Sequence, residues 1–205
     1  MKIPLQHAIV ARLTYKPLTG IWYRAIATVF LPTALSASHS RTVPGRFNDG
    51  SVAVPSFPVL YLAEDPLLAM FEVQALFGSP TPGGIVPNPR RAVASVNVKI
   101  TLHRVADLTD LHEQSIFDTN VQELTGDWRG FKLRGPSTSV PLPTGSAPTQ
   151  ELGAALYAIP KLEGFLTVSA KLPYQQILVV FPDKLQSGSS IKHEDQDGNV
   201  YSLTF

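Results

Sequence analysis

Apolar and polar residues alternate along several short stretches of the chain, and this pattern predicts β-strands. In AVASVNVKI, residues 92–100, Ser95, Asn97 and Lys99 stand between apolar neighbours, as expected for a strand with one buried face. The tail SSIKHEDQDGNVYSLTF indicates two strands around a turn at Asp197-Gly198-Asn199. Further apolar runs predict strands at Val59–Leu62, Phe165–Val168 and Gln176–Phe181.

Helices are predicted where a capping residue precedes a longer apolar stretch. Asp65 can cap a helix with Pro66 at its first position, and we expect this helix to run to about Phe77, before a Gly-Ser-Pro stretch. A second helix is expected over residues 148–160, and the pattern also favours one over 118–124. Short strands mixed with segregated helices indicate an α+β fold, not an alternating parallel one.

The connections between these elements are rich in helix and strand breakers. The 18 prolines and 14 glycines of the 205 residues are concentrated in connectors, above all in residues 79–89 and 135–148. These two connectors are candidates for loops around a pocket mouth, although each such stretch is more often a plain surface connection.

Composition narrows the class of protein. Hydrophobic residues make up 44% of the chain, as in a globular domain, whereas charged residues make up only 16%. This low charge content fits a face covered by a partner, or homo-oligomerisation. The net charge of +1 argues against direct binding of nucleic acid, which requires a basic excess.

Several kinds of chemistry and location are also disfavoured. The chain has no cysteine, which excludes disulfides, thiolate zinc sites and cysteine nucleophiles, and which is compatible with a reducing cytoplasm. The five histidines are scattered singly, so we expect no metal site. No run of about 18 apolar residues predicts a membrane span, and the N-terminal segment lacks the apolar stretch of a signal peptide.

Glu72 is the unusual residue of the first predicted helix. Leu68, Ala69, Ala75 and Leu76 flank it on its own face, and apolar residues cover most of the rest. A helix that is apolar nearly all round is mostly buried, so Glu72 is predicted to lie at the base of a pocket. Two interpretations remain open: a structural ion pair with an arginine, or a catalytic carboxylate.

Four further residues are candidates for the same pocket. Arg24 in IWYRAI occupies a strand-like segment, where an inward arginine suggests an anion or a carboxylate partner. Arg46 and Asn48 lie in a GRFN turn, in which the glycine lets the backbone approach a ligand. Tyr61 ends an apolar run. Each also has a plainer interpretation. Arg24 could be a surface strand position, the GRFN residues could form an ordinary solvated turn, and Tyr61 could be a core tyrosine.

These motifs resemble the RES domain, a family named for an arginine, a glutamate and a serine. The resemblance rests on YRA at 23–25, GRFN at 45–48, VLYLAED at 59–65, and Glu72, in that order and spacing. Phe47 replaces the tryptophan of the familiar GRWN form. TQELGAALY at 149–157 and GFLTVSA at 164–170 are similar to the family's C-terminal helix and serine-bearing strand. Ser169 is our choice of serine; the alternatives are Ser137, Ser139 and Ser146.

The resemblance covers about residues 20–183 and has consequences for fold and organisation. It implies an ADP-ribosyltransferase-like α+β fold, in which mixed β-sheets form a central core with flanking helices. We expect one domain over residues 1–205, with an N-terminal arm at 1–19 and a C-terminal hairpin at 184–205.

The resemblance also implies a function. Members are bacterial toxins that consume NAD⁺ at the nicotinamide–ribose bond, by hydrolysis or with inorganic phosphate as co-substrate. They are neutralised by a cognate antitoxin; some relatives of the fold are secreted effectors with an immunity protein. A cytoplasmic site of action follows, either in the producing cell or after delivery into a target cell.

The residues suit that chemistry. Glu72 would stabilise the developing positive charge on the ribose, and Arg24 and Arg46 would hold the diphosphate. Tyr61, Tyr23 and Asn48 would contact the substrate, and Ser169 would orient the nicotinamide or ribose. NAD⁺ is then a substrate and no cofactor is required.

Two rival functions remain open: protein ADP-ribosylation, and a non-catalytic binding module. The chain has no glycine-rich dinucleotide fingerprint, which disfavours a dehydrogenase.

Overall fold

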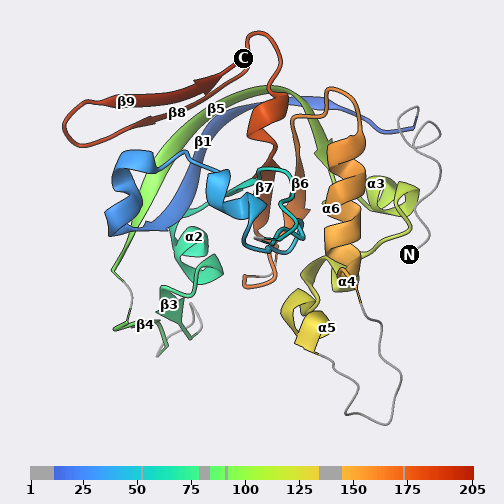
Figure 1. Ribbon diagram of the computed structural model, residues 1–205, viewed down its shortest axis with the longest axis horizontal. Helices are drawn as coiled ribbons and strands as arrows, with labels where there is room; N and C mark the ends of the chain where they lie inside the picture. Colours follow the sequence, from blue (N-terminus) through green and yellow to red (C-terminus); the bar gives the residue numbers. More distant parts are fainter. Residues whose placement is uncertain (1–11, 52, 79–83, 91, 134–144, 173) are drawn as a thin grey trace.

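The computed structural model describes residues 12–51, 53–78, 84–90, 92–133, 145–172 and 174–205 (Figure 1). Its strands are β1 Lys16–Ala27, β2 Leu60–Ala63, β3 Leu76–Phe77, β4 Val86–Pro87, β5 Val93–Asp107, β6 Gly164–Val168, β7 Gln176–Val180, β8 Ser190–Glu194 and β9 Val200–Thr204. Its helices are α2 Pro66–Glu72, α3 Leu111–Ile116, α4 Val121–Thr125, α5 Trp128–Leu133 and α6 Pro148–Ala158. Three 3-10 turns are η1 Thr28–Thr33, η2 Ser38–Arg41 and η3 Pro182–Lys184.

Seven strands form one sheet in the order β1-β2-β7-β6-β5-β8-β9. Because β1 also pairs with β5 along nearly its whole length, β1, β2, β7, β6 and β5 close into a ring of hydrogen-bonded strands. β5 and β6 are parallel, and the other neighbours in the sheet are antiparallel. The β8–β9 hairpin extends this sheet from the outer edge of β5 (Figure 1).

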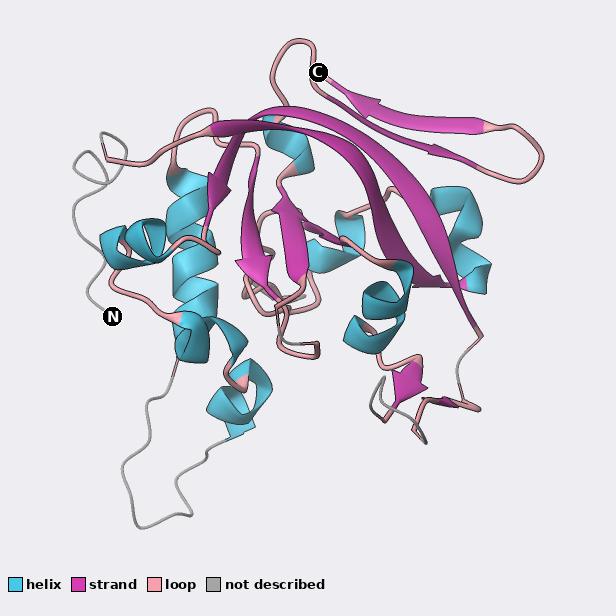
Figure 2. Cartoon of the chain, turned by 180° about the vertical axis from the view of Figure 1, so that it is seen from behind, coloured by secondary structure: helices cyan, strands magenta, loops and turns pink. Residues whose placement is uncertain are grey.

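The inner strands are apolar on both faces because each face packs against its own core. In β7, Ile177 and Val179 belong to one core, and Leu178 and Val180 to the other, as alternation along a strand requires. The first core is covered by α2, α3, α4 and α6, of which the last three gather on one side of the molecule (Figures 1 and 2). The second core includes the connection between η1 and η2.

Helix α6 fixes the GRFN turn through an unusually close approach. A Cβ atom at Gly153 would lie 1.9 Å from the carbonyl oxygen of Phe47, so only glycine fits there without a shift of the backbone. Gln150, one turn earlier, donates from Nε2 to the carbonyl oxygens of Gly45 at 2.9 Å and Asn48 at 3.2 Å. The turn therefore depends on a helix that lies about a hundred residues further along the chain.

Most of the predicted elements are confirmed. The four predicted strands correspond to β2, β5, β6 and β7, although β5 continues to Asp107. The tail forms the predicted hairpin of β8 and β9, and the helix predicted at 148–160 is α6. The α+β class is likewise confirmed.

The predicted extension of the first helix to Phe77 is wrong. Asp65 does cap α2, accepting from the backbone N–H groups of Leu67 and Leu68, but the helix ends at Glu72. Gln74 adopts a left-handed conformation with φ 58°, which breaks the helix. Asn88 stabilises this turn by donating from Nδ2 to the carbonyl of Gln74 at 2.9 Å.

The helix predicted at 118–124 is displaced. Asp118 has a φ of 51°, and α4 begins only after Asn120, whose Oδ1 accepts from Glu123 N–H at 3.0 Å. Other predictions fall on residues that are not described: most of the arm at 1–19, the first part of both breaker-rich connectors (79–83 and 135–144), and the alternative serines Ser137 and Ser139. Within the described ranges, no helix is long and apolar enough to cross a membrane.

Replacing Gly153 by alanine should destabilise the fold. The added methyl group would overlap the Phe47 carbonyl, and overpacking of this kind costs about 1–3 kcal/mol. We expect a lower melting temperature in thermal denaturation, by about 2–4 °C per kcal/mol. Gly20→Ala is the matched control, because its Cβ would meet nothing closer than 4.0 Å. Equal melting temperatures for the two variants would contradict the prediction.

Candidate functional site

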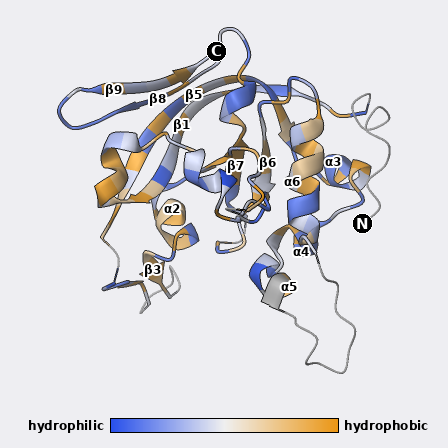
Figure 3. Ribbon diagram, viewed as in Figure 1, coloured by the Kyte–Doolittle hydropathy of each residue, from blue (hydrophilic) through white to orange (hydrophobic). Residues whose placement is uncertain are grey.

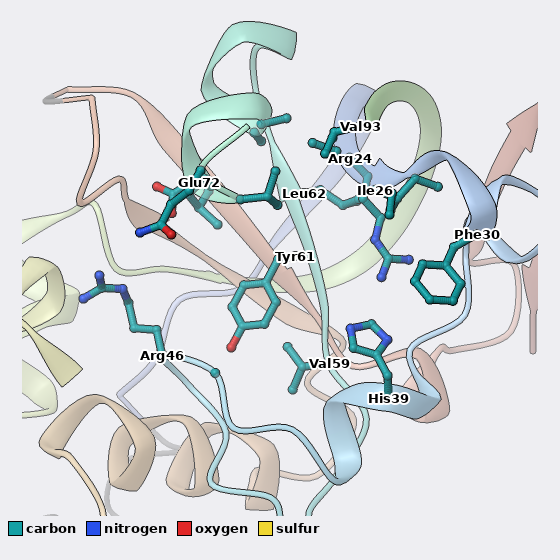
Figure 4. Close-up of a pocket in the computed structure, with 18 of the residues that line it drawn as sticks. Arg24, Ile26, Phe30, His39, Arg46, Val59, Tyr61, Leu62, Glu72 and Val93 are labelled. Carbon is teal, nitrogen blue, oxygen red and sulfur yellow. The ribbon is translucent and has the colours of Figure 1, made fainter. Parts of the chain in front are cut away.

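A cavity of about 1160 Å³ opens where β1 and β2 separate (Figure 4). β1 and β2 are paired at a single position, Tyr23 with Ala63, so the two strands separate on either side of that pair. The walls come from β1, η1, η2, the GRFN turn, β2, α2 and residues 127–129. The cavity thus collects side chains from distant parts of the sequence.

Glu72 lies at the end of α2 and is half-buried in the cavity wall. Its Oε1 accepts a hydrogen bond of 2.6 Å from Ser169 Oγ. Ser169 is buried and lies just after β6, outside the set of lining residues; its Oγ accepts in turn from the N–H groups of Lys171 at 2.9 Å and Leu172 at 3.1 Å. Because these N–H groups fix the serine oxygen, the hydroxyl hydrogen is directed to Glu72, whose carboxylate is held in one orientation.

Arg46 lies near Glu72 and is held by the end of a helix. Its Nη1 donates to the carbonyl oxygens of Leu124 at 3.1 Å and Gly126 at 2.6 Å, the C-terminal groups of α4, where a cation is favoured. Burial lowers the pKa of Arg46, while the negative charges of Glu72 and Asp127 act in the opposite direction. The positive charge of Arg46 is therefore partly balanced by these two carboxylates.

Main-chain carbonyls also hold Arg24, but within the described residues no carboxylate offsets its positive charge. It donates to the carbonyl of Ala34 and to that of Ser36, the latter at 3.1 Å from Nη1 and 3.2 Å from Nη2. Burial lowers the pKa of Arg24 to about 10, and no carboxylate in the described part of the chain acts on that pKa. Nor does Glu72 form an ion pair with either arginine in this part of the chain, so the structural ion-pair interpretation is wrong.

Tyr61 lies between the two arginines, with Arg46 on one side of its ring and Arg24 on the other (Figure 4). Its hydroxyl accepts from Phe47 N–H at 3.0 Å and donates to Asn48 Oδ1 at 3.1 Å. Burial strongly raises the pKa of this phenol, so the ring stays uncharged. The Tyr23 side chain also lines the cavity.

Asn48 has a different place from the one its motif suggested. It is fully buried and lies outside the lining set; its Nδ2 donates to the carbonyls of Ser40 at 2.5 Å and Val43 at 3.3 Å. A Cβ at Gly45 would lie 2.5 Å from Asn48 Oδ1 and 2.8 Å from the Tyr61 hydroxyl. Gly45 and Asn48 therefore shape the turn that presents Arg46.

The sequence analysis missed several lining residues. Trp128 and Arg129 line the cavity, and the charge of Arg129 acts on Arg46. Phe30 and His39 stand beside Arg24 (Figure 4). Arg129 lies over the Trp128 ring at 5.3 Å from its centroid. The only sequence signal was the DWRG stretch that follows a helix; Phe30 and His39 carry none, because they reach the cavity through short 3-10 turns.

Comparisons with known proteins agree with this architecture. Residues 21–201 match the RES domain, and the chain belongs to the RES domain family. The chain is also similar to a structure of the M. tuberculosis MbcT-MbcA toxin-antitoxin complex, with 20% identity and a TM-score of 0.60 over 97% of this chain and 91% of that chain. The predicted ADP-ribosyltransferase-like fold is confirmed. A search of curated proteins gives no significant match.

The raised pKa of Tyr61 predicts a loss of stability at high pH. An unfolded tyrosine titrates near pH 10, whereas the buried phenol keeps its proton above that pH. The stabilisation is therefore complete below pH 10 and lost as the pH rises further, by up to about 1.4 kcal/mol per pH unit. Urea denaturation at a series of pH values should show a shallower decline for Tyr61→Phe, despite its lower starting stability. Parallel declines would contradict this.

Proposed function

We propose that the protein cleaves the nicotinamide–ribose bond of NAD⁺. The observation that carries this proposal is the Glu72 carboxylate, which Ser169 holds in a fixed orientation in the wall of a large cavity beside the Arg46 guanidinium. Membership of the RES domain family supports it. A carboxylate so fixed needs no reorganisation when charge develops opposite it, which is the condition for effective electrostatic stabilisation.

The reaction breaks the bond between the ribose C1′ and the pyridinium nitrogen. The bonding electron pair leaves with the nitrogen, so nicotinamide departs as a neutral molecule and the ribose acquires oxocarbenium character. Glu72 stabilises that positive charge. A water or a phosphate oxygen then bonds to C1′, and a proton is lost from the water or hydrogen phosphate, which gives ADP-ribose or its 1″-phosphate.

The other residues bind and orient the substrate. Arg46 and Arg24 each have a guanidinium that main-chain carbonyls hold in place, and this planar group suits the oxygens of a diphosphate. Tyr61 and Tyr23 offer aromatic surfaces to the rings of the dinucleotide. Asn48 acts indirectly, by shaping the turn that carries Arg46, and Ser169 acts by positioning Glu72.

A further part of the proposal is that this NAD⁺ cleavage makes the protein a toxin with a cognate antitoxin or immunity protein. The similarity to a chain of a toxin-antitoxin complex supports this role. Val29 and Phe30 at the cavity rim are 75% and 59% exposed, an apolar surface that a partner could cover. Its site of action would be a cytoplasm, where NAD⁺ is present.

Replacing Glu72 by glutamine should abolish most of the cleavage. The variant keeps the shape of the side chain but removes the charge, so we expect turnover of NAD⁺ to fall by at least about 10²-fold. The assay is incubation of purified protein with NAD⁺, with and without phosphate, and identification of products by mass. Glu151→Gln, an exposed position on α6, is the control.

The product distinguishes the rival functions. ADP-ribose or its 1″-phosphate identifies hydrolysis or phosphorolysis, whereas a mass increase on a protein identifies ADP-ribosyl transfer. No cleavage by the wild-type protein, or near-normal turnover by Glu72→Gln, would reject the proposed reaction.

Ser169 should behave as a positioning residue. Ser169→Ala removes the hydrogen bond to Glu72 and the acceptor of two backbone N–H groups. We expect kcat to fall by roughly tenfold with little change in KM, because the carboxylate remains but is no longer held. Ser115→Ala is the control, since that residue is exposed and its hydroxyl donates to the His112 carbonyl of the same helix, α3. A change in KM alone would show that Ser169 acts on substrate binding instead.

A further inference from the structure

The cavity has one side around Arg46 and another around Arg24, and the two sides differ in the charges that surround the arginine. On the Glu72 side, the charge of Arg46 is opposed by the carboxylates of Glu72 and Asp127, while the like charge of Arg129 acts in the other direction. On the other side of Tyr61, Arg24 has no carboxylate acting on it in the described part of the chain. We call this second region, lined by Arg24, Phe30 and His39, the Arg24 lobe (Figure 4). Arg24 repels a cation in this lobe, whereas the carboxylate of Glu72 attracts one on the other side.

Phe30 gives the Arg24 lobe an aromatic surface without a covering residue. It lies in η1, no residue of which is buried, and its own side chain is 59% exposed. Figure 3 shows this turn, which follows β1, coloured largely as hydrophobic. No ring contact of Phe30 is found within the described residues. An exposed phenylalanine of this kind forgoes the stabilisation that burial would give.

The turn is nevertheless firmly positioned. Thr28 N–H donates to the carbonyl of Ala92 at 3.1 Å before η1, and Ala34 N–H donates to Leu31 at 3.1 Å after it. Arg24 then holds the carbonyls of Ala34 and Ser36. The backbone segment that carries Phe30 is therefore held in place at the edge of the cavity.

His39 supplies a second ring from η2, directed towards Arg24 and Phe30 (Figure 4). Partial desolvation and then the charge of Arg24 lower its pKa, so the imidazole is neutral at pH 7. A neutral imidazole offers a flat face together with one donor and one acceptor nitrogen. The Arg24 lobe thus combines two rings with a guanidinium plane.

We propose that the Arg24 lobe binds the purine base of the dinucleotide, with Phe30 as its stacking surface. Bases stack on aromatic side chains and on guanidinium planes, and adenine carries no charge that Arg24 would repel. The nicotinamide ring of NAD⁺ is a cation and belongs at the Glu72 side. The identity of the base as adenine rests on the proposed function. The lobe therefore fixes the direction in which the substrate lies in the cavity.

Binding of AMP tests the lobe without any catalysis. By titration calorimetry, wild-type protein should bind AMP, and Phe30→Ala should bind it about tenfold or more weakly, as expected for loss of one stacked base contact. Phe30→Tyr, which keeps the ring, should restore binding. Leu31→Ala is the matched control, since it removes an exposed apolar side chain of the same turn that does not line the cavity. No AMP binding by the wild type, or equal affinities for Phe30→Ala and Leu31→Ala, would overturn the proposal.

A second experiment compares the cleavage of NAD⁺ with that of nicotinamide mononucleotide, which has the scissile bond but no adenosine. The ratio of kcat/KM for NAD⁺ to that for the mononucleotide should fall about tenfold in Phe30→Ala and stay constant in Leu31→Ala. An unchanged ratio in Phe30→Ala would overturn the base assignment. If the wild-type protein cleaves neither compound, the proposed function fails, and the AMP arm alone decides whether the lobe binds a purine.

Discussion

The hydrogen bond from Ser169 to Glu72 joins two distant parts of the chain at the candidate site. It links residues that lie 97 positions apart, and its geometry depends on the termination of α2 at Glu72 and on the turn after β6. Backbone N–H groups hold the serine oxygen from the other side. A carboxylate held in this way keeps its direction without an arginine partner, so its negative charge remains available to the cavity.

The guanidinium groups of Arg24 and Arg46 are likewise held by uncharged partners. A carboxylate partner would neutralise the charge of a guanidinium, whereas a carbonyl oxygen fixes the group and leaves its charge in place. Arg46 uses the end of α4 for this purpose, and Arg24 uses the connection after η1. Both charges are therefore oriented before any ligand arrives, which reduces the side-chain entropy lost on binding.

Sequence reasoning found the elements whose signals are local. Strands with a period of two and the Asp65 cap depend on neighbouring residues, and these predictions agree with the structure. The end of α2 could not be predicted, because the left-handed Gln74 is stabilised by Asn88 from a later segment. The hydrogen-bond partners of the arginines could not be predicted either, because every residue has a main-chain carbonyl and residue type does not indicate which one accepts.

The reliance of the GRFN turn on Gln150 and Gly153, and of Glu72 on Ser169, has a consequence for synthesis. A ribosome adds residues in order, so a nascent chain that stops before Ser169 contains Arg24, Arg46 and Glu72 but cannot assemble them. The site is therefore completed only when the chain has been made as far as Ser169, after more than four fifths of its 205 residues.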